Sequence, residues 1–190
     1  MEPVTTIEGD VSVLDRDDVD TDQIIPKQFL KRIERTGFGE FLFYDWAKEP
    51  GWSLPASPIL ASGRNFGCGS SREHAVWALY DYGFRAVIAP SFGDILFNNC
   101  TKMGLLPVVL PQSQVAAVMR AGSAKVDLRE GTVTWSGGSA TFDLDPRIRH
   151  SLLNGLDDIS ANLGHLDEIE AFEAGKTVHL PNTLELEQHL

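Results

Sequence analysis

Residues 59–82 read ILASGRNFGCGSSREHAVWALYDY and carry the clearest structural signal in the 190-residue chain. The apolar start, Ile59–Ala61, predicts a short buried strand, and the glycine-rich turn Gly67–Gly69 follows it. From Ser70 to Tyr82 the apolar residues recur at helical spacing, which predicts a helix that ends at Gly83. The stretch is therefore expected to be a strand–turn–helix unit.

On either side of this unit, strand and helix patterns alternate along the chain. The predicted strands are residues 11–14, 59–61, 86–89 and 105–110. The predicted helices are residues 70–82, 92–103 and 112–121, together with residues 146–172, which are interrupted at Gly155. Residues 27–46 predict helix and loop, and residues 48–58 predict a loop rich in proline, glycine and serine. Alternating strands and helices favour a sheet that is at least partly parallel.

After residue 121 the pattern changes. Three short segments with alternating polar and apolar residues, separated by turns that contain glycine, predict an antiparallel meander. They are residues 125–128, 132–135 and 140–143. The expected fold class is therefore mixed α/β, with a partly parallel central sheet and an antiparallel ribbon.

The composition is that of an ordinary globular protein, at 43% hydrophobic and 23% charged residues. The length favours one domain over residues 1–190, with a mobile C-terminal tail from about residue 178. No run of eighteen apolar residues occurs, and the first residues do not resemble a secretory signal. We therefore expect a cytoplasmic protein without a membrane span.

The charge and the cysteine count restrict the partners. Asp and Glu number 27 against 16 Lys and Arg, which argues against nucleic acid or an anionic membrane as a partner. The two cysteines, Cys68 and Cys100, do not form a CxxC pair. A zinc site usually needs four ligands, and a four-iron four-sulfur cluster needs three or four thiolates. Any metal chemistry must therefore come from outside this chain.

The glycine-rich turn is the main candidate for chemistry. Glycines allow the main chain to approach a ligand closely, and Ser70 and Glu73 have the spacing of a capping box with Ser70 as N-cap. The first turn of the helix would then offer free N–H groups and the positive end of the helix dipole. An anion is expected there, and Arg72 adds a planar fork that suits a carboxylate.

Other interpretations of this turn remain open. Ser70 would only cap its helix if the turn were purely structural. A nucleotide-phosphate loop is disfavoured because no lysine follows the glycines. A Ser–His hydrolase is disfavoured because His74 lies in the same helix and no GxSxG is present.

Three further features favour structural roles. The acidic stretch from Asp15 to Asp22 lacks the spacing of an EF-hand, so most of its aspartates are expected in turns or in solvent. Cys68 is expected to be a small packing residue, because no base for a thiolate nucleophile is identifiable. The aromatic segment 38–46 is expected in the core or at an interface.

Two motifs in the chain resemble the signatures of the small domain of the aconitase superfamily. They are residues 67–75, GCGSSREHA, and residues 18–26, DVDTDQIIP. Within that superfamily the chain is most similar to the small subunits of bacterial 3-isopropylmalate dehydratase, also called isopropylmalate isomerase. The resemblance extends over about residues 10–175, and two long motifs in the right order are more specific than either alone.

This resemblance implies a three-layer β/β/α swivelling domain. It also implies a hydro-lyase that interconverts 2-isopropylmalate and 3-isopropylmalate by dehydration and rehydration in leucine biosynthesis. The substrate would be a 2-hydroxy dicarboxylic acid. Activity would require a large subunit that carries a four-iron four-sulfur cluster and forms a heterodimer with this chain, which would bind no metal itself.

The resemblance further assigns roles to four residues. Ser70 matches the general base, an alkoxide that removes a proton from carbon. Ser71 and Arg72 match contacts to a substrate carboxylate, and Asp22 matches an acidic residue of the active site. Because serine is a poor base at its free pKa, it needs the helix N-terminus and cationic neighbours. The aromatic segment 38–46 follows the motif of residues 18–26, in a region that this superfamily uses for substrate specificity.

Alternative functions stay open at this point. The same chemistry could serve citraconate, 2-methylmalate or a homoaconitate-type acid, since one methylene changes binding by only about 1–3 kcal/mol. A non-catalytic carboxylate-binding module that regulates a partner is an alternative of another class. A stand-alone hydrolase would be active without iron or a partner.

Overall fold

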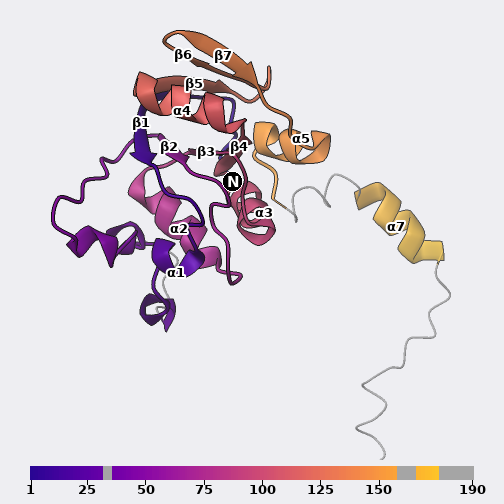
Figure 1. The fold of residues 1–190 in the computed structure, drawn as a ribbon. Helices are drawn as coiled ribbons and strands as arrows, with labels where there is room; N and C mark the ends of the chain where they lie inside the picture. Colours follow the sequence, from indigo (N-terminus) through magenta and orange to yellow (C-terminus); the bar gives the residue numbers. More distant parts are fainter. Residues whose placement is uncertain (32–35, 158–165, 176–190) are drawn as a thin grey trace, which may run out of the picture. The chain divides into compact units, whose positions relative to one another are not determined.

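The computed structural model describes residues 1–31, 36–157 and 166–175. It groups Met1–Asp157 into one compact unit and Asp158–Leu190 into a second. The described part of the second unit is helix α7, Leu166–Gly175. The remaining elements belong to the first unit (Figure 1).

A seven-stranded sheet organises the first unit, in the order β4-β3-β2-β1-β5-β6-β7. Its strands are β1 Thr6–Leu14, β2 Ile59–Ser62, β3 Ala86–Ala89, β4 Leu106–Val109, β5 Ser123–Asp127, β6 Thr132–Trp135 and β7 Gly138–Thr141. Strands β4, β3, β2 and β1 are parallel, and β1, β5, β6 and β7 are antiparallel. Strand β1 joins the two halves, because residues 11–14 pair with β2 while residues 6–10 pair with β5.

The helices of the first unit are α1 Thr21–Ile24, α2 Glu73–Tyr82, α3 Asp94–Met103, α4 Gln112–Ala121 and α5 Pro146–Asn154. The described residues between α1 and β2 include the short 3₁₀ turns η1 Lys27–Lys31, η2 Gly39–Phe41 and η3 Trp46–Lys48. Among the described residues, no helix is long and apolar enough to cross a membrane.

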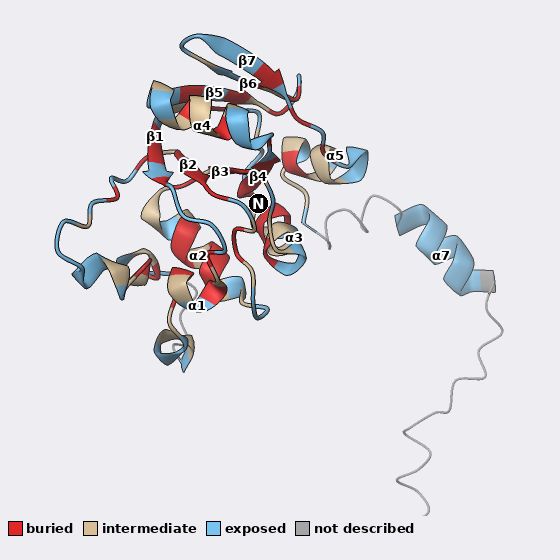
Figure 2. Cartoon of the chain, in the orientation of Figure 1, coloured by how far each residue is buried: buried red, intermediate tan, exposed pale blue. Residues whose placement is uncertain are grey.

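Two hydrophobic clusters lie on opposite faces of the parallel strands. On one face, Leu60 and Val87 pack with residues of α2 and α3. On the other face, Ile59, Ala61 and Ile88 pack with residues of α4, α5 and the antiparallel strands. Successive side chains of a strand point to opposite faces, so four-residue strands that are apolar throughout supply both clusters. Buried residues accordingly line both the sheet and the inner side of α2 (Figure 2).

This arrangement gives three layers: helices α2 and α3, the parallel strands, and the curled antiparallel strands with α4. The predictions of a mixed α/β fold, a partly parallel sheet and an antiparallel ribbon are confirmed. Strand β1 is longer than predicted, because residues 6–10 pair with β5. The single-domain prediction stays a prediction, and the predicted tail from residue 178 lies outside the described residues.

One helix prediction needs correction, and one is confirmed as far as the described residues reach. The described parts of residues 27–46 form short 3₁₀ turns where helix and loop were predicted. Residues 146–172 contain α5, which ends where predicted, at Gly155 with its left-handed φ of 67°.

Candidate active site

Strands β1, β2 and β3 end at the same edge of the parallel half of the sheet. Residues 15–20, 63–72 and 90–93 leave these strands as loops at that edge. In open α/β sheets, ligands bind in the crevice beyond the carboxyl ends of the strands. Both sequence motifs therefore lie where such a fold places its ligand.

Main-chain hydrogen bonds join the loop after β1 to the glycine-rich loop after β2. The N–H of Gly67 donates to the carbonyl of Val19 at 2.7 Å, and the N–H of Thr21 donates to the carbonyl of Cys68 at 2.9 Å. The hydroxyl of Thr21 donates to the carbonyl of Ser70 at 3.0 Å. Two segments about fifty residues apart in sequence thus form one structural unit.

Side chains extend this connection at the outer end of the two loops. Asp17 pairs with Arg64 at 3.1 Å and accepts a hydrogen bond from the Arg64 N–H at 2.9 Å. The amide of Asn65 donates to the carboxylate of Asp18 at 2.8 Å. Most of the aspartates in this stretch were predicted to be turn or solvent residues, and these three contacts show that Asp17 and Asp18 bind the neighbouring loop.

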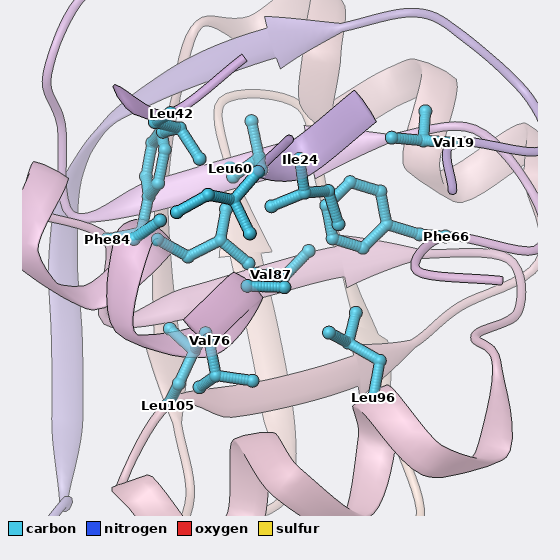
Figure 3. Close-up of a cluster of buried hydrophobic side chains, with 14 of the residues drawn as sticks. Val19, Ile24, Leu42, Leu60, Phe66, Val76, Phe84, Val87, Leu96 and Leu105 are labelled. Atoms are coloured by element: carbon cyan, nitrogen blue, oxygen red, sulfur yellow. The ribbon is translucent and has the colours of Figure 1, made fainter. Parts of the chain in front are cut away.

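Gly67 is required where it stands. Its φ is 73°, and a Cβ at this position would lie 1.9 Å from Cδ2 of Leu96. The glycine therefore lets the loop pack directly on α3, in a left-handed conformation that glycine adopts at little cost. Beneath the loops, Val19 and Ile24, from the motif of residues 18–26, share the core with Phe66 and Leu96, as Figure 3 shows.

Asp22 and Arg72 form the central ion pair of the site. Nη1 of Arg72 lies 2.5 Å from Oδ1 of Asp22, and Nη2 donates to Oδ2 at 2.7 Å. Nη1 also donates to the carbonyl of Ile25 at 3.3 Å. The Arg72 side chain is 11% exposed and that of Asp22 53%. The hydrogen bond from Arg72 holds the pKa of Asp22 below its ordinary value, so Asp22 is ionised at neutral pH.

Ser70 and Ser71 lie in the loop directly before α2, and both are exposed. The predicted capping box is wrong. Helix α2 begins at Glu73, its N-cap is Arg72, and no side chain caps it. The Ser70 carbonyl accepts a hydrogen bond from Thr21, and Arg72 is in an extended conformation ahead of the helix. The free N–H groups of α2 therefore start at Glu73, and Arg72 separates them from the two serines.

His74 and Cys68 do not form a nucleophile–base pair with Ser70 in this structure. The His74 ring lies 4.5 Å from Trp77 and 5.3 Å from Phe38, between centroids. Burial lowers the pKa of His74, which is therefore neutral at pH 7. Burial and the nearby carboxylates of Asp20 and Asp18 raise the pKa of Cys68. A thiol with a raised pKa is a weak nucleophile, in line with the packing role predicted for it.

The chemistry of the thiols does not suit a metal cluster. Cys100 is fully buried in the core, where burial raises the pKa of its thiol, and Cys68 is half-buried. In the part of the chain that the structure describes, no group of three or more His, Cys, Asp or Glu side chains could hold a metal ion. A four-iron four-sulfur cluster does not fit the residues of this site.

Two residues of the site were missed by the sequence analysis. Asp20 is the N-cap of α1, where its carboxylate accepts from the Gln23 N–H at 2.8 Å. The spacing Asp20-x-x-Gln23 is itself a capping box, so the signal was present in the sequence. Thr21 had no such signal, because its contact with Ser70 is made only in the folded chain.

Comparison with known proteins places this geometry in a family. The Aconitase C-terminal domain model matches residues 48–113, which include the glycine-rich loop. A 3-isopropylmalate dehydratase small subunit from Rubrobacter xylanophilus is 50% identical, over 97% of this chain and 100% of that protein. A protein of the same name from Halalkalibacterium halodurans is 52% identical, over 93% of this chain and 100% of the relative.

A solved structure agrees with these relatives. The crystal structure of 3-isopropylmalate dehydratase from Methanocaldococcus jannaschii matches with a TM-score of 0.69 at 25% identity. The match covers 88% of this chain and 99% of that one. The relatives are matched along nearly their whole length, so the similarity includes both loops of the site. This chain belongs to the family of 3-isopropylmalate dehydratase small subunits, within the aconitase superfamily.

Proposed function

We propose that this chain is the small subunit of a hydro-lyase that interconverts 2-isopropylmalate and 3-isopropylmalate in leucine biosynthesis. The observation that carries the proposal is the match at about 50% identity to small subunits of that name over nearly their full length. The geometry supports it, since one edge of the sheet holds a guanidinium and two exposed serines in adjoining loop positions.

Arg72 and Ser71 are proposed to bind a carboxylate of the substrate. The ion pair with Asp22 and the bond to Ile25 hold the guanidinium in one orientation. Nε and one hydrogen on Nη2 have no acceptor among the described residues, so they are available to a ligand. An orientation set before binding reduces the entropy that binding must offset.

Asp22 has a positioning role in this proposal. Its carboxylate accepts from both terminal nitrogens of Arg72, and it stays ionised because its pKa is lowered. Replacing it would leave the Ile25 carbonyl as the remaining acceptor of the guanidinium among the described residues, so its orientation would be less fixed. The proposed site residues are thus Ser70 as general base, Ser71 and Arg72 as substrate contacts, and Asp22 as their support.

Ser70 is proposed to remove the proton from the substrate carbon. Its hydroxyl makes no hydrogen bond within the described part of the chain, and the residue is exposed. The ionised Oγ takes the proton from carbon, and the C–H electron pair forms the double bond as hydroxide leaves the neighbouring carbon. In the rehydration hydroxide adds to one of the two carbons while Oγ returns its proton to the other. Arg72, two residues further along the chain, supplies positive charge that favours the ionised oxygen.

The superfamily also implies an iron–sulfur cluster, which the thiols of this chain do not fit. We propose that a large subunit carries the cluster and forms a heterodimer with this chain in the cytoplasm. No step above runs through the cluster. The open edge of the site supports this division, because two of its four proposed residues, Ser70 and Ser71, are exposed in the isolated chain.

The proposal is tested by anaerobic turnover of 2-isopropylmalate and of citraconate, followed by absorbance of the unsaturated acid. Each acid is supplied to this chain alone and to this chain mixed with its cluster-loaded large subunit. We expect turnover of 2-isopropylmalate only in the mixture, with a higher kcat/KM than for citraconate. A preference for citraconate would change the assigned substrate, and turnover without the partner would refute the subunit assignment.

A further inference from the structure

We propose that Thr21 is a positioning residue for the general base, and that its hydroxyl is needed for turnover although it contacts main chain only. This inference rests on the proposed function of Ser70. It goes further by naming the residue that fixes where the base stands.

The contacts of Thr21 carry the inference. Thr21 is 2% exposed, and its hydroxyl donates to the carbonyl of Ser70 at 3.0 Å, across 49 positions of sequence. Its N–H donates to the carbonyl of Cys68 at 2.9 Å. Thr21 therefore holds the glycine-rich loop at two carbonyls, one on each side of Gly69.

Gly69, which lies between these two carbonyls, has the greatest conformational freedom in the glycine-rich turn. Gly69 has a φ of 95°, and a Cβ there would meet only ordinary contacts, the nearest being Oγ1 of Thr21 at 3.5 Å. Glycine leaves the main chain many conformations, so hydrogen bonds on either side must select one. The Ser70 side chain makes no hydrogen bond of its own among the described residues, so the main chain determines which positions the χ1 rotamers of Ser70 offer to Oγ.

Thr21 also links the base to the carboxylate fork. It is the first residue of α1, which Asp20 and Gln23 cap with reciprocal hydrogen bonds at 2.8 and 2.9 Å. The next residue, Asp22, holds Arg72. A single turn of helix thus fixes Ser70 on one side and Arg72 on the other, and the Thr21 hydroxyl is the side-chain contact between that turn and the serine.

The test compares Thr21→Val with Thr21→Ser in the full chain, assembled with its large subunit. Valine keeps the shape and removes the hydroxyl, and serine keeps the hydroxyl. We expect Thr21→Val to lower kcat about tenfold or more with KM within about threefold, and Thr21→Ser to recover most of kcat. The reason is that a displacement of about 1 Å at a reacting group can cost about a hundredfold in rate.

Thr101→Val is the matched control. Thr101 is also buried, at 9% exposure, and its hydroxyl donates to a main-chain carbonyl, that of Asn98, at 2.8 Å. It lies on α3, outside the proposed site. We expect this variant to lose stability like Thr21→Val and to keep the wild-type kcat. Equal losses of kcat in the two variants would reduce Thr21 to a stabilising residue and overturn the proposal.

Hydrogen–deuterium exchange of the free chain gives a readout that needs no substrate. Amides of residues 67–72 are expected to exchange faster in Thr21→Val than in the wild type, and at the wild-type rate in Thr101→Val. Unchanged exchange in Thr21→Val would overturn the positioning role. Failure of the wild-type complex to convert isopropylmalate would instead overturn the proposed function, while the exchange comparison would still decide whether Thr21 orders the loop.

Discussion

Arg72 is the residue on which the electrostatics of the site depend. Its planar fork engages both carboxylate oxygens of Asp22, and one of its nitrogens also engages the Ile25 carbonyl. A lysine at this position would offer a single point charge in place of the fork. The chain's resemblance to the superfamily assigned Arg72 to the substrate, and the structure adds that Asp22 is its partner within the chain.

Arg72→Lys is expected to raise KM for 2-isopropylmalate by about 10–100-fold, since bidentate charge-assisted bonds are lost. Steady-state kinetics of the assembled enzyme measure this effect. Arg64→Lys is the matched control, because Arg64 pairs with Asp17 at the exposed outer end of the loops. A KM for Arg72→Lys within twofold of the wild-type value would refute carboxylate binding by this guanidinium.

His74 gives the chain a pH dependence of stability. Burial lowers its pKa in the folded state, so the unfolded state binds more protons as the pH falls below the ordinary histidine value of about 6.5. The contribution of neutral His74 is therefore complete above that pH and is lost as the pH falls. Urea unfolding at pH 7.5 and 5.5 is expected to show a larger loss of stability for the wild type than for His74→Gln. Equal losses would contradict this assignment.

At the scale of elements, the loop after β2 is shaped more by its tertiary contacts than by its local sequence. The strand–turn–helix order of residues 59–82 was predictable from periodicity and glycine placement, and it is confirmed. The start of α2 was not predictable, because the capping spacing of Ser70 and Glu73 competes with the hydrogen bond from Thr21 to Ser70. A contact across 49 residues has no signature in a local pattern.

The start of the short helix α1, by contrast, was predictable from local sequence. Its capping signal, Asp20-x-x-Gln23, was present but was not distinguished from the neighbouring aspartates. The meander was predictable because alternation and turn glycines are both local. Of the candidate site, the local sequence pointed to Ser70 and Arg72, the resemblance supplied Ser71, Asp22 and the roles of all four, and the structure brings Arg72 and Asp22 together.

Gly67→Ala tests how tightly this loop packs on α3. A Cβ would lie 1.9 Å from Leu96, and the residue has a φ of 73°, so we expect a loss of about 2–5 kcal/mol in the free energy of unfolding. Gly51→Ala is the control, with a φ of 81° and no atom within 4 Å of the added Cβ, and should lose only about 1–2 kcal/mol. Denaturant unfolding measures both. Equal losses would show that backbone strain alone, without contact against α3, sets the cost at Gly67.

At the scale of the whole molecule, the hydrophobic core of the described residues lies in the first unit. Both hydrophobic clusters are built from residues between Met1 and Leu153. Strand β1 lies at the centre of the sheet and joins its parallel and antiparallel halves, so the two clusters share one framework. We expect these residues to unfold as one cooperative unit.

Truncation after Asp157 tests this expectation. The shortened chain should unfold in one transition with Tm within about 4 °C of the full chain, which corresponds to about 1 kcal/mol. Circular dichroism and calorimetry measure the transition. A truncated chain that fails to fold would show that residues 158–190 belong to the same cooperative domain.

The central claim is that this chain supplies the general base of the assembled hydro-lyase from Ser70. The most direct test is kcat of the Ser70→Ala enzyme at saturating 2-isopropylmalate, with the exposed Ser139→Ala of β7 as control. We predict that Ser70→Ala assembles and binds substrate normally but loses at least about a hundredfold in kcat, and that the control keeps its rate. A kcat for Ser70→Ala close to that of the wild type would contradict the account.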